Sequence, residues 1–382
     1  MSLRAVILLV SAAVLLLLPA CAGPDPVSGC EDGCDIGVMV YVGDAKIRNY
    51  RPRPMLVTPA SDIPRARHPA VDIHCHWKID LDPADLIAAM DERGVTRAIN
   101  LSGGWGRDLE KQLVRFARYA PDRLLIFCTP DFSKIDDPDF GAALTRKLES
   151  ARAAGATGVK IFKNLGLTIR DRSGALVPVD DPRLDPLWAT AGRLNMPVLI
   201  HTGDPAAFFQ PIDRHNERWM QLKRHPDWSF HGPRFPGRDE VLAQRNRMIA
   251  RHPGTSFIGA HMGGNPEDLA ALGRTLDALP NLHVDISGRV AELGRQPNTA
   301  RRFFLRYADR VLFGTDRYPG RKVQPRYRIY FRFLETADEY FDYYDHAFPP
   351  AGEWRIYGID LPDEVLRKVY RANADRLLGF DS

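Results

Sequence analysis

Histidine and aspartate residues stand at or just after the ends of several short apolar runs of this chain. They are His74 and His76 at the end of the first run, His201 and His261 at the ends of two later runs, and Asp316 just after another. Buried groups of these types are costly unless they are paired or bound to a metal. Together they suit Zn²⁺ or another divalent first-row ion, including Mn²⁺, Fe²⁺ and Co²⁺. The pattern therefore indicates a metal site that activates water or polarises a substrate oxygen.

The spacing of these residues supports one shared site. Residues i and i+2 of a strand point to the same face, so His74 and His76 are expected to project together. Lys160 adds a further polar position inside the apolar run 158–162. A single histidine at a strand end is more often a hydrogen-bonded core residue than a ligand. Polar positions on five separate runs favour a common centre.

Short apolar runs alternate with longer amphipathic stretches from residue 70 onward. The expected strands are 70–76, 97–101, 124–129, 158–162, 197–201, 256–261, 282–287 and 310–315. The expected helices are 83–93, 108–120, 139–154, 183–195, 239–252, 266–279, 299–308 and 362–378. Strands that are apolar on both faces and separated by helices indicate a parallel sheet covered on both sides. Eight such units predict an α/β fold, a distorted (β/α)₈ TIM barrel, and the dinucleotide-binding glycine fingerprint of an open sheet is absent.

Two connections are longer than the others. They run over about 204–238 after strand five and about 317–360 after strand eight, and both are rich in aromatic residues. Long connections are uncommon unless they are functional. Both follow the carboxyl ends of strands, where the loops of a barrel build the active site. We expect these insertions to roof the metal site.

As a set, these motifs resemble the metal-dependent amidohydrolase superfamily. The similarity covers about residues 70–380 and is greatest to the amidohydrolase-related branch, which includes the aminocarboxymuconate-semialdehyde decarboxylase-like enzymes. The resemblance implies that His74, His76, His201 and Asp316 bind one catalytic divalent metal, with zinc as the first expectation. It also implies that His261 acts in proton transfer or in polarising the substrate.

Lys160 is open to two interpretations. In two-metal members of the superfamily, a lysine on strand four is carbamylated and bridges both ions. The alternative is an ordinary ammonium that binds a substrate carboxylate or a neighbouring aspartate. We favour one metal.

Four other residues near the strand ends are candidates for supporting roles. Asp285, on strand seven, is a candidate to orient a ligand imidazole, because metal-bound histidines usually need such a partner. Arg289, Lys163 and Asp204 follow strands seven, four and five and are candidates for substrate contact.

Three functions fit this residue set. The first is a hydrolase that uses a metal-activated water on an amide, ester or lactone-type bond of a small molecule. The second is a metal-dependent decarboxylase of an unsaturated or aromatic carboxylic acid. The third is a non-catalytic surface binding lipoprotein, which the intact set of polar strand ends disfavours.

The N-terminus predicts export. Arg4 precedes an apolar stretch at 5–18, which is shorter than the roughly 20 residues of a membrane span and fits a secretory signal. The following Leu-Pro-Ala-Cys ends at Cys21 and resembles the bacterial lipobox, in which the cysteine is lipidated and becomes the new N-terminus. An uncleaved anchor is the alternative. We therefore expect a signal peptide over 1–20, a tether over 21–68 and a barrel domain over 69–382.

Composition limits the partners. Lys plus Arg total 52 and Asp plus Glu total 48, so the formal net charge of +4 is small and nucleic acid is not expected. The expected partners are a small-molecule substrate and a membrane bound through the N-terminal lipid, on the periplasmic or cell-surface side, with the outer membrane preferred. Cys30 and Cys34 are a candidate local disulfide in that oxidising compartment. Homo-oligomerisation stays open.

Overall fold

The computed structural model describes residues 54–320, 324–344 and 349–380. The expected signal peptide, the lipidation site Cys21 and the Cys30/Cys34 pair lie outside these residues. Residues 58–382 form one compact unit. Within the described parts of the chain, no helix is both long and apolar enough to cross a membrane.

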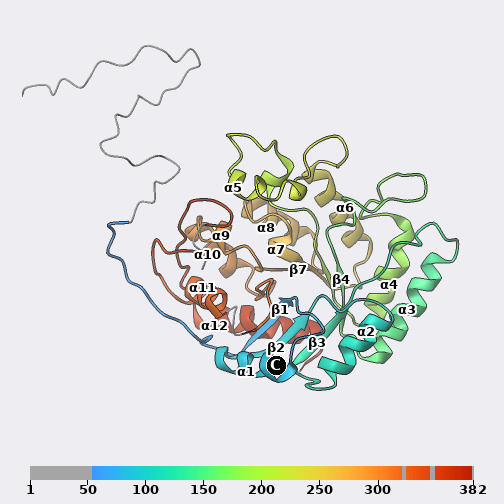
Figure 1. The fold of residues 1–382 in the computed structure, drawn as a ribbon, viewed down its shortest axis with the longest axis horizontal. Helices are drawn as coiled ribbons and strands as arrows, with labels where there is room; N and C mark the ends of the chain where they lie inside the picture. Colours follow the sequence, from blue (N-terminus) through green and yellow to red (C-terminus); the bar gives the residue numbers. More distant parts are fainter. Residues whose placement is uncertain (1–53, 321–323, 345–348, 381–382) are drawn as a thin grey trace, which may run out of the picture. The chain divides into compact units, whose positions relative to one another are not determined.

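Eight parallel strands form the centre of this unit, in the order β1 to β8. They gather at its middle with the helices outside them (Figure 1). The strands are β1 (Ala70–Cys75), β2 (Val95–Asn100), β3 (Leu124–Cys128), β4 (Gly158–Ile161), β5 (Val198–Ile200), β6 (Phe257–Gly259), β7 (Leu282–Asp285) and β8 (Val311–Leu312).

The chain closes this sheet by returning to its first strand. The amide of Ile73 donates to the carbonyl of Phe313 at 3.0 Å, and the amide of Asp316 donates to the carbonyl of His74 at 2.9 Å. The segment just after β8 thus hydrogen-bonds β1, and the predicted (β/α)₈ barrel is confirmed. The β8 ladder is shorter than the predicted strand 310–315, because the chain turns from it toward the site.

Helices follow the strands as the sequence pattern predicts. Outer helices are α1 (Pro83–Arg93), α2 (Arg107–Gln112), α3 (Phe140–Ala154), α4 (Asp185–Arg193), α6 (Arg238–Arg251), α8 (Leu269–Ala278), α10 (Pro297–Arg306), α12 (Asp363–Arg367) and α13 (Asn373–Leu378). In α1 the Asp82 side chain accepts the amide of Ala84 at 2.8 Å, and Gly94 ends the helix at a φ of 73°. A polar cap at one end and a left-handed glycine at the other set the bounds of this helix.

Both long insertions are present, and they contain short helices. The first holds α5 (Trp219–Leu222), which lies at the upper edge of the unit in Figure 1. The second holds α11 (Gln324–Glu335), a 12-residue helix that the sequence pattern did not predict. Two further one-turn helices follow β6 and β7: α7 (Ala260–Gly263) and α9 (Val290–Leu293). These additions surround the carboxyl ends of the strands, where the candidate residues lie.

Alternation along the strands separates two apolar layers. Residues such as Leu199, Ile258 and Leu312 fill the barrel interior, whereas Val198 and Phe257 pack outward under the helices. The side chains that follow the carboxyl ends of these strands therefore lie directly on this interior layer.

Candidate metal centre

An irregularity in β1 aims its two histidines into the barrel. Val71 and Ile73 point to the interior, so simple alternation would turn His74 outward. The pairing of β1 with β2 shifts register between Asp72 and Cys75. A bulge of this kind lets consecutive residues keep the same face. His74 and His76 therefore both reach the site.

Three of the predicted ligands meet at the carboxyl end of the barrel. The Nε2 atoms of His74 and His76 lie 3.4 and 3.5 Å from Oδ1 of Asp316. One ligand atom from each of these three residues lies within 4.8 Å of the other two. This spacing is suited to a single ion between them.

The tautomer of His74 follows from its partner. Nδ1 of His74 lies 2.9 Å from Oδ2 of Asp285, which is fully buried. A carboxylate oxygen only accepts, so Nδ1 carries the hydrogen and Nε2 presents a lone pair. That lone pair faces the Asp316 carboxylate without a hydrogen between them. A lone pair and a carboxylate oxygen repel each other, and a cation between them would attract both. The donor set therefore fits a divalent metal.

The electrostatics of the site keep His76 and Asp316 deprotonated. Burial, with His74 and Lys160 nearby, lowers the pKa of His76 to about 3. Burial alone would raise the pKa of Asp316, but the adjacent His74 and His76 outweigh it and bring that pKa below 3.8. Neutral imidazole and ionised carboxylate are the forms that bind a metal.

His261 lies beside this cluster with one ring nitrogen already engaged. Its ring centroid is 4.8 Å from that of His74. Its Nδ1 lies 2.7 Å from the carbonyl oxygen of Ser287, and its backbone amide donates to Oδ1 of Asp285 at 3.0 Å. Because a carbonyl only accepts, Nδ1 holds the hydrogen and Nε2 is left with a lone pair. Burial also lowers the pKa of His261 well below 6.5.

His201 is close to the cluster but is not joined to it. Its ring centroid lies 4.4 Å from that of His261. Its Nε2 is buried without a hydrogen bond, and the nearest carboxylate is Asp204, with Oδ1 at 3.5 Å. The structure thus brings together three of the four predicted ligands and leaves an unsatisfied nitrogen on the fourth.

Lys160 is buried at the base of the site. Burial lowers its pKa to about 8, although the carboxylates of Asp285 and Asp316 oppose that effect. Its ammonium lies 5.3 Å from the centroid of the Phe162 ring. A lysine with a lowered pKa is more often neutral, which is the form that carbamylation needs.

The three residues predicted for substrate contact form one charged group. Asp204 accepts from Lys163 at 2.5 Å and lies 3.9 Å from the guanidinium of Arg289. Burial alone would raise the pKa of Asp204, but His201, Lys163 and Arg289 reduce it to about 2. The group borders the same cavity as His201 and His261.

Sequence reasoning missed a second carboxylate below the ligands. Asp72 is fully buried and accepts hydroxyl hydrogen bonds from Thr315 and Tyr327, each at 2.6 Å. It also accepts the amide of His74 at 3.1 Å. Burial raises its pKa to about 6. Its position two residues before His74 on an otherwise apolar strand was the available signal.

Two more missed residues come from the loop after β7 and from α11. The Ser287 hydroxyl lies 2.8 Å from Nδ1 of His74 and 3.0 Å from Nδ1 of His261. The hydroxyl of Tyr330 accepts the amide of Gly288 at 2.6 Å. A Cβ on Gly288 would come within 3.6 Å of Oδ2 of Asp316, so this tyrosine fixes backbone directly beside the ligands.

A cavity of about 420 Å³ opens at the candidate metal ligands. His201, His261 and Asp316 lie in its wall, and the insertions contribute aromatic side chains. Its basic lining residues are Lys163, Arg218, Arg224, Arg289, Arg317 and Arg326. The predicted roof over the site is therefore present, and the excess of cations suits an anionic small molecule.

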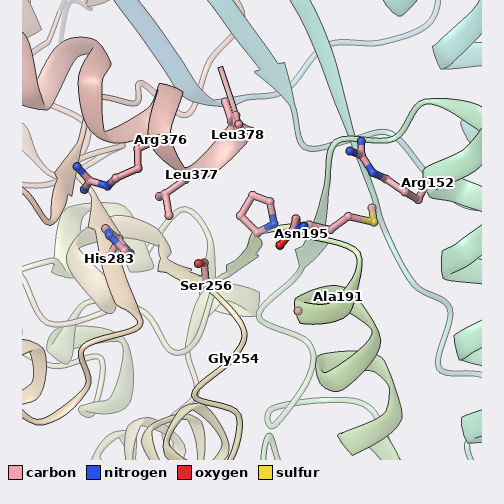
Figure 2. Close-up of a pocket in the computed structure, with 13 residues that line it drawn as sticks. Arg152, Ala191, Asn195, Gly254, Ser256, His283, Arg376, Leu377 and Leu378 are labelled. Atoms are coloured by element: carbon pink, nitrogen blue, oxygen red, sulfur yellow. The ribbon is translucent and has the colours of Figure 1, made fainter. Parts of the chain in front are cut away.

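A second cavity lies at the opposite end of the barrel, where β5 to β7 begin. Figure 2 shows His283 and Arg376 on one side of it and Arg152 on the other. Its volume is about 560 Å³, and its lining includes no carboxylate. Ligand side chains do not converge there, so the chemistry belongs to the other end.

Comparisons with known proteins agree with this geometry. The model of a family described as amidohydrolase matches residues 71–380. No curated protein matches the chain.

Solved structures share the fold at low sequence identity. The 2,6-dihydroxybenzoate decarboxylase from Rhizobium has a TM-score of 0.53 and 18% identity, over 82% of this chain and 99% of that one. A dihydroxybenzoic acid decarboxylase from Polaromonas with bound manganese has a TM-score of 0.50 and 16% identity, over 82% of this chain and 97% of that one. An amidohydrolase from Burkholderia multivorans with bound zinc has a TM-score of 0.51 and 15% identity, over 82% of this chain and 99% of that one.

Proposed function

Because the chain belongs to the amidohydrolase family, whose model spans residues 71–380, we propose that it is a metal-dependent hydrolase of a small molecule. The bond cleaved is an amide, ester or lactone. The observation that carries this proposal is the convergence of the Nε2 atoms of His74 and His76 on the carboxylate of Asp316. Three protein ligands with an open side are the arrangement of a catalytic metal rather than a structural one.

His74, His76 and Asp316 would hold the ion, and His201 is the fourth proposed ligand. A divalent ion there supplies an acidified water or a polarised substrate oxygen. Zinc is the first candidate, and the zinc and manganese bound in the two fold neighbours support a metal of this class.

Two residues of the chain are proposed to accept and donate the protons of the reaction. Asp316 lies in the cavity wall and accepts the proton of the attacking water. His261 presents Nε2 as a base, since its Nδ1 is committed to Ser287. It can protonate a leaving group only after it has itself taken up a proton.

Decarboxylation is the second candidate, and the basic cavity favours it. A substrate carboxylate would be held by cations such as Arg289, Arg317 and Arg326, which line the cavity. The two fold neighbours named as decarboxylases of 2,6-dihydroxybenzoate and of dihydroxybenzoic acid support this reaction class. On this reading, His261 would first take up a proton from solvent at Nε2 and then deliver it to the carbon that the departing CO₂ leaves.

Metal content and product analysis test both reactions. Elemental mass spectrometry of the purified chain is expected to give about one divalent ion per chain. A panel of esters, lactones, amides and aromatic carboxylic acids is expected to show metal-dependent hydrolysis. CO₂ release from an acid would select the decarboxylase instead. Two ions per chain would make Lys160 a carbamylated bridge, and metal without any turnover would favour the binding lipoprotein.

We also propose that lipid on Cys21 anchors the protein to the exported side of a membrane, with the outer membrane preferred. The Cys21→Ala variant is expected to move from the membrane fraction to the soluble fraction, because the acyl chains supply durable anchoring. Immunoblotting of the separated fractions measures this. Continued membrane association would point to an uncleaved N-terminal anchor.

A further inference from the structure

His261 stands in a backbone conformation that is rare for its residue type. Four consecutive residues, 261 to 264, have positive φ, with His261 at φ 58° and ψ 51° and Met262 at φ 59° and ψ 38°. Side-chain crowding makes left-handed turns unfavourable for L-residues, and only single residues adopt them routinely. Such a turn persists where its surroundings fix it, and such positions cluster at functional sites.

A buried cation without an acidic partner lies against this turn. Arg245 of α6 is 2% exposed. Its guanidinium donates to the carbonyl of Gly263 and to Oδ1 of Asn246, the latter at 2.9 and 3.1 Å. Among the described residues, no carboxylate forms an ion pair with it. A buried charge is costly without an opposite charge, so the guanidinium depends on these neutral acceptors, and the carbonyl of Gly263 is the one that belongs to the turn.

A second arginine, two helical turns earlier on α6, holds the next residue. Arg238 donates to the carbonyl of Gly264 at 2.6 Å and to Oδ1 of Asn265 at 2.8 Å. The carbonyls at the C-terminal end of a helical turn carry partial negative charge, which cations stabilise. The two guanidinium groups therefore satisfy both carbonyls at the end of the left-handed turn.

The turn has little freedom to relax elsewhere. A Cβ on Gly264 would lie 2.4 Å from the carbonyl oxygen of Thr202, so the backbone is already pressed against the end of β5. At its other end, the amide and the ring of His261 are held by Asp285 and Ser287. A shift of the turn therefore moves the His261 ring.

We propose that Arg245 and Arg238 are positioning residues, which hold the left-handed turn and so fix the orientation of the His261 ring toward the cavity. This inference rests on the proposed function, in which His261 moves protons. Neither arginine contacts a proposed metal ligand. Arg238 also donates to the carbonyl of Asp204 at 3.3 Å and pairs with Glu267 at 3.3 Å, so Arg245 is the one whose effect reaches the chemistry only through the turn.

The Arg245→Met variant tests the proposal, since methionine fills part of the space without donating. Long-range ¹H–¹⁵N spectra of the zinc-loaded chain report the tautomer of each imidazole, and a His261→Gln spectrum assigns the signal. The expected result is that the Nδ1–H form of His261 is replaced by a mixture or a broadened signal. Zinc content stays within about 20% of the wild-type value.

Arg310→Met is the matched control. Arg310 also donates to backbone carbonyls, those of Leu279 and Leu282, but at the opposite end of the barrel. Its removal is expected to leave the His261 signal unchanged. Arg238→Gln gives an independent test if Arg245→Met does not fold, because Arg238 is less deeply buried than Arg245, with its side chain 15% exposed.

Activity provides the second readout. On whichever panel compound the wild type turns over, Arg245→Met is expected to lower kcat at least tenfold with KM changed less than threefold. An unchanged His261 tautomer in both arginine variants would overturn the proposal. If the wild type turns over nothing, the proposed function fails, and the imidazole spectra still decide whether the arginines position the ring.

Discussion

The Asp316→Asn variant is expected to keep a folded barrel and lose most of its turnover. Asp316 has a φ of 59°, and asparagine tolerates the left-handed region as well as aspartate does, so the backbone should not change. The amide cannot accept the proton of the attacking water. It also brings no negative charge to the Nε2 atoms of His74 and His76, which lie 3.4 and 3.5 Å away. Loss of a general base lowers kcat by about 10² to 10⁴.

Steady-state kinetics with saturating zinc, on a compound that the wild type hydrolyses, measure this effect. Circular dichroism checks the fold. Asp309→Asn is the matched control, because Asp309 is an exposed carboxylate that pairs with Lys368 away from the site. Turnover near the wild-type level in Asp316→Asn would remove the proposed role of this residue. Equal loss in both variants would point to a general defect.

The barrel was predictable because its signals are local and repeated. Eight short apolar runs that alternate with amphipathic stretches specify strands and helices without any knowledge of distant contacts. The polar strand ends were predictable for the same reason, since parallel strands place their carboxyl ends at one edge. His74, His76 and Asp316 meet there as the pattern implies.

What the pattern missed depends on non-local contacts. The inward face of His74 requires a bulge after Asp72, and alternation counted from Val71 and Ile73 gives the opposite face. Asp72 itself is held by Tyr327, which is 255 positions away in the sequence. The left-handed turn at His261 depends on arginines of α6 and on the backbone of Thr202. Sequence periodicity carries no information about such partners.

The helix α11 is the clearest case of this limit. The sequence marks this segment only as part of an aromatic-rich insertion expected to roof the site, and Tyr327 and Tyr330 are fully buried in the structure. Their hydroxyls, however, bond Asp72 and the amide of Gly288, which are next to His74 and Asp316 respectively. The insertion therefore supports the backbone around the candidate metal ligands as well as contributing to the roof.

Asp285→Asn is expected to weaken metal binding while leaving every proposed ligand in place. Asp285 accepts from Nδ1 of His74, from the amide of His261, and from the amide and hydroxyl of Ser287. An asparagine NH₂ group facing Nδ1 would require that nitrogen to accept, which moves the ring hydrogen to Nε2. An imidazole protonated at Nε2 has no lone pair for the ion there. Loss of such a supporting partner lowers metal affinity by about 10- to 100-fold.

Competition with a chromophoric zinc chelator measures the dissociation constant directly. Asp375→Asn is the matched control, because Asp375 is also fully buried and charge-paired, with Arg97 and Arg371 at the far end of the barrel. Both substitutions remove a buried carboxylate, so both are expected to lower the unfolding temperature of the metal-free chain. Only Asp285→Asn should raise the dissociation constant for zinc. An unchanged constant would mean that the His74 tautomer does not depend on Asp285, and a parallel rise in Asp375→Asn would trace the effect to lost stability.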